Sequence, residues 1–465
     1  MRDFTSGSIL RQVITFSIPL IAGNFFLSAY NIINMIWVGR LLGHEAVAAI
    51  SAAMPILFLF PSFLIGLSMA ANILIAQAYG RKDMVLLGKV LSNSFSVMLI
   101  ICLALTVAGI FLRDVLLGLV NAPPAIRPMA SAFLGITFIG FLPGFFFNWM
   151  NGTLRGLGDS KTPLKILFLA TLLNISLVPL LIAGPGPFPA LGLTGAAWGS
   201  ITANILAGIW GYRYIARKNP IFNIRKWDFT TDRLLVKKIF SIGIPASLQM
   251  IVVSLSGVFI LSLVNKWGTE VTAAYGIGMQ IDQLAFLPAM SIGIAVTSMA
   301  GQNLGAQLFE RVEQATRIAL FLSLAIAACF CALVYIFPYQ IGSVFLKQAG
   351  ANLVVLDHVV IYYRWIGFCY LGYAVMFTLQ GVVRSSGDTV ALLVLALISL
   401  VLVRVPLAYF LSQKAGFGEN GIWMGILFST FIGIILSYAY YKTGRWKRKQ
   451  LMPHSPRPNS VPNPE

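Results

Sequence analysis

The sequence has few charged residues, few acids and few of the residues that build metal or disulfide sites. Charged side chains make up 10% of the 465 residues, whereas 58% are hydrophobic. This charged fraction is far below that of soluble domains, which excludes an ordinary soluble fold. The four cysteines all lie in apolar runs and have neither metal nor disulfide spacing. They are Cys102, Cys329, Cys331 and Cys369.

Enzyme signatures are missing as well. The three histidines (His44, His358 and His454) are scattered along the chain, and no Walker loop is present. We therefore expect no enzymatic activity, no use of ATP, and no cofactor other than a coupling ion.

Long apolar runs fill most of the chain. A membrane-spanning helix needs about 20 mostly apolar residues, and twelve runs qualify. Because backbone groups in lipid must bond internally, we expect an all-α polytopic membrane protein. The expected spans are residues 13–39, 49–75, 91–112, 129–152, 163–184 and 191–216 in the first half, and 238–264, 271–300, 314–338, 355–380, 389–413 and 418–441 in the second.

The excess of positive charge follows the expected topology. The 33 Lys and Arg outnumber the 15 Asp and Glu, which gives a net charge of +18. With the N-terminus inside, the cytoplasmic segments hold 25 of the basic residues and the external segments six. This distribution is the positive-inside pattern. We expect a multi-pass protein of the plasma (inner) membrane with both termini cytoplasmic, some contact with anionic lipid, and no nucleic-acid partner.

The chain contains an internal duplication. Three pairs of segments match at a spacing of 225 to 229 residues, namely 43–54 with 268–279, 76–80 with 301–305, and 152–159 with 381–388. Six spans in each copy give both copies the same orientation. We therefore expect two six-helix repeats related by a pseudo-two-fold axis along the membrane normal, with a cleft between them, which is a common plan of transporters.

The same pattern divides the chain into four parts. We expect an N-terminal six-helix lobe at 1–216, a cytoplasmic linker at 217–237 and a C-terminal six-helix lobe at 238–445. The rest, 446–465, is basic and rich in proline and cannot build a core, so we expect a disordered cytoplasmic tail.

These elements together resemble the multidrug and toxic compound extrusion (MATE) transporters. The similarity rests on the six-plus-six spans, Pro19 and Trp37-Val38 in the first span, Gly-Gln-Asn-Leu-Gly-Ala at 301–306, and Gly-x-Leu-Arg-Gly-x-Gly-Asp at 152–159 with its copy at 381–388. The resemblance implies export of small amphiphilic or cationic compounds by alternating access, driven by inward flow of protons or sodium ions.

The chain departs from this family at its usual carboxylates. The family commonly has an aspartate in the first span where this chain has Asn34, and another before the proline of the fifth span where it has Val178. Some branches have a third in the tenth span, at the position of Tyr373. By resemblance these are cation and proton sites, so the N-terminal lobe lacks the usual ionic groups.

Only one acid lies deep inside an expected span, and this makes Asp282 the main candidate for ion coupling. The two intramembrane cations, Arg364 and Arg404, are expected at a similar depth, so we predict that the three residues form one polar cluster. Three roles remain open for Asp282: a fixed ion pair between spans, the coupling carboxylate of transport, or direct contact with substrate.

The N-terminal lobe offers uncharged candidates. Asn34, Asn174 and Ser200 could bind sodium through amide and hydroxyl oxygens, but they cannot carry a proton. Interhelical hydrogen bonding is the alternative for this set. For a substrate cavity we single out flexible and aromatic side chains that suit varied or planar ligands, with packing or lipid contact as the alternative. They are Tyr30, Asn31, Met54, Tyr275, Met279 and Tyr373.

The sequence thus favours a monomeric secondary active exporter of small amphiphilic molecules. A flippase for lipid-linked or other amphiphiles from the wider superfamily remains the alternative within transport. From another class, a membrane receptor or scaffold would show no exchange between inward- and outward-accessible states. A channel is disfavoured because no span carries a repeated polar filter motif.

Overall fold

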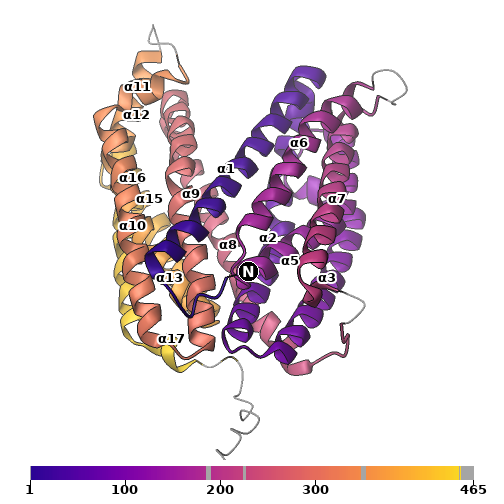
Figure 1. Ribbon diagram of the computed structural model, residues 1–465. Helices are drawn as coiled ribbons and strands as arrows, with labels where there is room; N and C mark the ends of the chain where they lie inside the picture. Colours follow the sequence, from indigo (N-terminus) through magenta and orange to yellow (C-terminus); the bar gives the residue numbers. More distant parts are fainter. Residues whose placement is uncertain (1, 185–189, 224–226, 347–351, 450, 452–465) are drawn as a thin grey trace, which may run out of the picture.

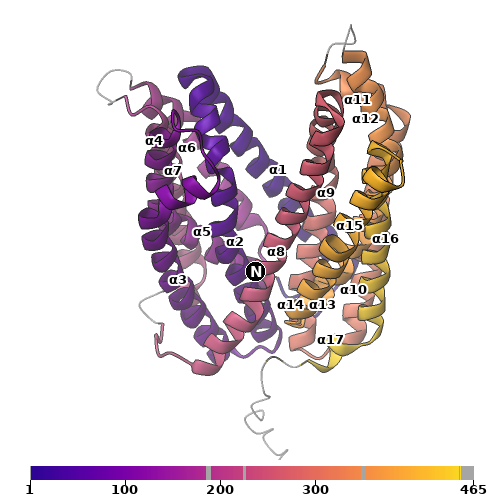
Figure 2. The same ribbon diagram turned by 180° about the vertical axis from the view of Figure 1, so that it is seen from behind.

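The structure is a computed structural model that describes residues 2–184, 190–223, 227–346, 352–449 and 451. Within these residues every regular element is a helix. The helices form two lobes that approach each other at the end where α17 lies and diverge toward the end where α11 lies (Figures 1 and 2). We refer to these ends as the α17 end and the α11 end.

The N-terminal lobe consists of seven helices. They are α1 (Ile9–Leu42), α2 (His44–Gly80), α3 (Met84–Leu119), α4 (Arg127–Ile139), α5 (Phe141–Gly156), α6 (Lys161–Ala183) and α7 (Leu193–Lys218). A single turn, η1 (Pro220–Phe222), follows α7.

The C-terminal lobe repeats this order. Its elements are α8 (Arg233–Val264), η3 (Asn265–Trp267), α9 (Thr269–Gly305), α10 (Phe309–Ile336), α11 (Pro338–Ser343), α12 (Asn352–Ile366), α13 (Cys369–Ser385), α14 (Thr389–Ala396), the π-helix η4 (Leu397–Arg404), α15 (Val405–Tyr409), the π-helix η5 (Phe410–Lys414), α16 (Glu419–Lys442) and α17 (Arg445–Arg448).

The twelve-span layout is confirmed. In the described part of the chain, nine helical segments are long and apolar enough to cross a membrane. Two further spans are bent pairs, α4 with α5 at 46° and α12 with α13 at 44°. The twelfth is α7, which is 26 residues long and more polar. The bends lie at Gly140 and Gly367, which occupy corresponding positions in the two repeats (367 − 140 = 227).

A reciprocal contact joins the lobes at the α17 end. Gln77 of α2 donates to the Ser385 carbonyl at 2.8 Å, and its repeat mate Gln302 of α9 donates to the Gly156 carbonyl at 2.9 Å. Beside these bonds the backbones touch. A Cβ atom at Gly80 would lie 1.9 Å from the Gln302 carbonyl oxygen, and one at Gly305 would lie 2.1 Å from the Gln77 carbonyl oxygen. We call these four residues the glutamine–glycine crossing.

The first helix of each repeat crosses to the opposite lobe. Val13 and Phe16 of α1 are buried in a hydrophobic cluster with α9 and α10, whereas Leu235 and Ile239 of α8 are buried in the cluster of the N-terminal lobe. The predicted linker is therefore too long, because α8 begins at Arg233 and is packed from its first turns. Of the predicted linker, residues 224–226 lie outside the described part.

The first and last described segments of the chain are docked at the α17 end. Phe4 is fully buried in the cluster of α9 and α10, and Leu451 is buried in the cluster of the N-terminal lobe. The predicted disordered tail is wrong at its start: Arg445–Arg448 form α17, because Trp446 is buried and stacks on Tyr441. Residues 450 and 452–465 of that tail lie outside the described part.

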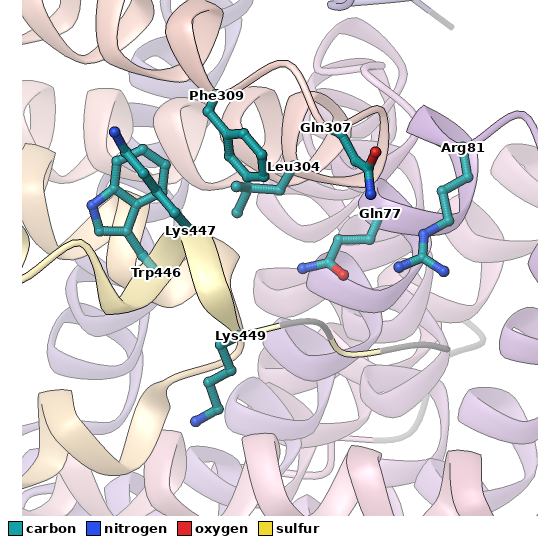
Figure 3. A pocket seen from close by; sticks show the side chains of 8 residues that line it. All are labelled: Gln77, Arg81, Leu304, Gln307, Phe309, Trp446, Lys447 and Lys449. Carbon is teal, nitrogen blue, oxygen red and sulfur yellow. The ribbon is translucent and has the colours of Figure 1, made fainter. Parts of the chain in front are cut away.

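A small pocket lies beside this docked tail (Figure 3). Gln77 of α2 and Arg81, the residue after that helix, line one side, and α17 contributes Trp446 and Lys447. Lys447 forms an ion pair with Glu313 at 2.5 Å. The remaining lining residues are Leu304, Gln307, Phe309 and Lys449. The pocket therefore borders the glutamine–glycine crossing, and α17 covers part of it.

We predict that Gly305→Ala lowers the stability of the protein by about 1–3 kcal/mol, because the added methyl group overpacks the crossing. The matched control is Gly276→Ala in the same helix, where an added Cβ meets nothing within 4 Å. Thermal unfolding in detergent checks this. Equal melting temperatures for the two variants would show that the crossing does not hold the lobes together.

Tail docking should depend on pH through Asp388. Burial opposes ionisation of this carboxyl, but hydrogen bonds from Lys449 (2.7 Å) and Tyr440 outweigh burial, so its pKa is lowered from 3.8. A lowered pKa stabilises the docked tail above pH 3.8 and this stabilisation is lost as the pH falls through the folded-state pKa. We expect a spin label at exposed position 448 to become mobile in that acidic range, and at pH 7 in Asp388→Asn. A label that stays immobile in Asp388→Asn would contradict this.

Candidate functional site

The buried acid of α9 is held by two tyrosines. Asp282 is 7% exposed. One carboxylate oxygen accepts a hydrogen bond from the hydroxyl of Tyr362, and the other accepts one from Tyr370 at 2.7 Å. Both bonds are made by neutral donors, so the carboxylate is satisfied without a counter-ion.

The bend between α12 and α13 brings the two tyrosines to one carboxylate. Tyr362 lies on α12 and Tyr370 on α13, and in a straight helix eight residues would separate them by about 12 Å. The 44° bend at Gly367 shortens this separation. The Tyr335 hydroxyl donates to the Arg364 carbonyl at 2.5 Å, next to the break. A side chain at Gly367 would collide with the Tyr335 ring, 2.6 Å from its Cβ.

Aromatic rings enclose Asp282 and exclude water from it. Tyr275 stacks on Trp423 with ring centroids 5.6 Å apart, and Tyr362 meets the same indole edge-on at 4.9 Å. Tyr363 contacts Tyr362 at 5.3 Å. Gly278 allows this packing, since a Cβ there would lie 2.4 Å from the Tyr362 ring. We call Tyr275, Tyr362, Tyr363, Tyr370 and Trp423 the aromatic cage.

The predicted cluster of Asp282 with two arginines is wrong. Arg404 ends the π-helix η4 and donates to Ser429 at 2.9 Å and Tyr373 at 3.0 Å instead. Arg364 is exposed. Within the described residues no ion pair forms at Asp282. Asp282 therefore forms no fixed ion pair with either arginine in this conformation.

The uncharged candidates of the N-terminal lobe do come together. Asn174 is fully buried and donates to the Ser200 hydroxyl at 3.0 Å. The side chains of Ser200, Asn34 and Asn204 surround the Tyr30 hydroxyl. The Oδ1 atoms of Asn34 and Asn174 are buried and have no hydrogen-bond partner within the described part of the chain. We call these five residues the amide cluster; sequence reasoning missed Asn204.

The remaining substrate-cavity candidates differ in their surroundings. Asn31, Met54 and Met279 are exposed. Tyr275 is 7% exposed and belongs to the aromatic cage. Tyr373 packs edge-on against Phe286 at 4.6 Å and accepts the hydrogen bond from Arg404. Contact of these residues with a substrate stays a prediction.

The comparisons with known proteins identify the family. The MatE family model matches residues 19–180 and 245–410, once in each repeat. The chain belongs to the MATE family of multidrug efflux transporters. This MATE chain is 34% identical over 451 residues to "Probable multidrug resistance protein YpnP" of Bacillus subtilis (strain 168), and the match covers 97% of this chain and 98% of the relative.

Other similarities agree with this assignment. The MATE chain is 33% identical over 449 residues to "Probable multidrug resistance protein YoeA" of the same organism, and the match covers 96% of each. The fold matches a structure described as "Crystal structure of MATE in the bent conformation" with a TM-score of 0.87 at 22% identity, and the match covers 96% of this chain and 98% of that one.

We predict that removing a cage hydroxyl destabilises the protein. Tyr370→Phe leaves one oxygen of a buried carboxylate without its donor and should cost about 1–3 kcal/mol. Thermal unfolding in detergent measures this, with Tyr438→Phe at an exposed position as control. The same loss in an Asp282→Leu background would show that the hydroxyl acts through other contacts.

Proposed function

We propose that this chain is a secondary active exporter in which Asp282 carries the coupling proton. The observation that supports this most directly is a carboxylate deep in a membrane lobe, enclosed by aromatic rings and held by tyrosine hydroxyls alone. A buried charge without a counter-ion is costly, whereas the neutral acid is not. Protonation at this site therefore changes the energy of the closed cage.

The arrangement of the aromatic cage on four helices also provides a basis for alternating access. Its groups come from α9, α12, α13 and α16, so a shift of one helix against the others opens Asp282 to water. The proton affinity of the carboxylate then differs between the closed and opened cage, which is the condition for coupling proton flow to a conformational change. With the α17 end in the cytoplasm, the present arrangement is an outward-facing state.

Sodium is the alternative coupling ion, and the amide cluster favours it. Asn34 and Asn174 each present a buried carbonyl oxygen without a hydrogen-bond donor, and the Ser200 and Tyr30 hydroxyls lie beside them. Carbonyl and hydroxyl oxygens are suitable ligands for a hard cation. The cluster contains no acid, so it would serve sodium and not protons.

We further propose that the cargo is a small amphiphile, in keeping with the multidrug resistance names of the relatives. The protein would act as a monomer in the plasma (inner) membrane, with lipid around it and both termini cytoplasmic, and without catalysis. A flippase for lipid-linked or other amphiphiles predicts instead that labelled lipids, and no soluble cations, change sides.

The decisive experiment uses proteoliposomes with a pH gradient or a sodium gradient imposed separately. We expect wild-type protein to accumulate a fluorescent cation when protons flow the opposite way, and Asp282→Asn to lose this accumulation while still binding the dye. Glu270→Gln, an exposed acid of the same helix α9, should behave as wild type. Unchanged proton stoichiometry in Asp282→Asn would refute proton coupling at this residue.

The sodium gradient provides the second arm. Accumulation driven by sodium without a pH gradient, and abolished by Asn174→Ala, would assign coupling to the amide cluster instead. Lipid scrambling or flipping in the same vesicles, with no dye flux, would favour the flippase.

A further inference from the structure

A second titratable pair lies between the aromatic cage and the α11 end. His358 of α12 and Glu419 of α16 are joined through Nδ1 and Oε1 at 2.7 Å. Their side chains are 25% and 12% exposed, so the pair meets solvent on one side. Neither residue stands out in the sequence, because His358 is an isolated histidine and Glu419 lies at a span end.

The pair is aligned with the cage on two helices at once. His358 precedes Tyr362 by four residues on α12, and Glu419 precedes Trp423 by four residues on α16. Residues four apart lie on the same face of a helix, about 6 Å apart along its axis. The ring centroids of Tyr362 and Trp423 are 4.9 Å apart. The ion pair therefore forms the next layer, one helical turn closer to the α11 end.

Hydrogen-bonding groups without a partner occur both in this layer and in the aromatic cage. The Glu419 Oε2 atom, the Tyr363 hydroxyl and the Trp423 Nε1 atom are buried and have no hydrogen-bond partner among the described residues. Tyr362 continues the set inward, because its hydroxyl already donates to Asp282. Tyr362, one helical turn from His358 on α12, therefore links the layer of the ion pair to the buried acid.

We infer that the His358–Glu419 pair is the outer relay through which Asp282 exchanges its proton with the external solution. This inference rests on the proposed function. The imidazolium of His358 passes one proton to the Tyr362 hydroxyl, directly or through one water molecule, as Tyr362 gives its own proton to the Asp282 carboxylate. Histidine becomes neutral, Asp282 becomes neutral, Tyr362 is unchanged, and external water recharges the imidazole.

The groups around His358 suit this role. The Glu419 carboxylate on α16 faces the imidazole at 2.7 Å, and on the histidine's own helix Asp357 is exposed and accepts a hydrogen bond from Tyr339 of α11. Arg364, also on α12, is exposed below the pair. Helix α9 contributes Tyr275 and Asp282 to the cage beneath it and the exposed Glu270 at its start.

A purely structural role predicts something different, and the chain offers a matched control. Trp365 of α12 donates a hydrogen bond to Asn420 of α16 at 2.9 Å. This neutral bond joins the same two helices as the ion pair, and Asn420 is the residue next to Glu419. If the ion pair only fixed α12 to α16, then Asn420→Ala and His358→Asn would have similar effects. A relay requires the titratable imidazole, which Asn cannot replace.

The test measures dye accumulation in proteoliposomes as a function of external pH, together with proton release from purified protein on substrate binding. We expect His358→Asn and Glu419→Gln to slow pH-driven transport by about a hundredfold, the lower end of the effect of losing a proton-transfer group. The rise of the transport rate as the external pH falls from about 8 to about 5 should flatten in both variants. Asn420→Ala should keep the wild-type pH profile.

The outcomes separate the relay from the proposed function. A wild-type pH profile in His358→Asn, with transport still lost in Asp282→Asn, overturns the relay and leaves proton coupling intact. The relay is also overturned if His358→Asn and Asn420→Ala lose the same amount of transport and show the same pH profile. Proton release that persists in Asp282→Asn refutes the proposed function itself. Folding of each variant is checked by its melting temperature and by dye binding.

Discussion

The glutamine–glycine crossing is the constraint on which the arrangement of the two lobes depends. Because each glycine lacks a side chain, the backbone of the opposite lobe can pack directly against it. Each glutamine donates a hydrogen bond to a backbone carbonyl of the other lobe. Gln77 and Gln302 are almost fully buried, so separating the lobes would leave buried amides to be solvated. The lobes are held here, and they diverge from this point toward the α11 end (Figure 2).

On this symmetric scaffold the polar chemistry is unequal. The repeat mate of Asp282 is Leu57 (282 − 57 = 225), and the mate of Arg404 is Leu177 (404 − 177 = 227). The N-terminal lobe gathers amides and hydroxyls, whereas the C-terminal lobe holds a carboxylate enclosed by rings. Val178 of the N-terminal lobe is fully buried against Gly199. Ionisable groups of the spans therefore concentrate in one lobe.

Hydrophobic runs and the duplication were enough to predict the spans and the two lobes, because lipid imposes length and apolarity directly. Asn34, Asn174 and Ser200 of the amide cluster were also predictable as polar residues within spans, whereas Asn204 was missed. The partners of Asp282 were not, since depth along a helix says nothing about the direction in which a side chain points. Tyr362 and Tyr370 are inconspicuous in a chain that is 12% aromatic, and only the bend at Gly367 brings them together. The docked tail was missed because a basic, proline-rich composition conceals the two buried anchors Trp446 and Leu451.

The crossing of α1 to the opposite lobe has a consequence for biosynthesis. The apolar side of α1 that includes Val13 and Phe16 packs on α9 and α10, which the ribosome completes only when residue 336 has been made. Until then this face of the first helix has no protein partner. The halves of the chain, although internally alike, are therefore not separable folding units: each remains unfinished until the other has been inserted.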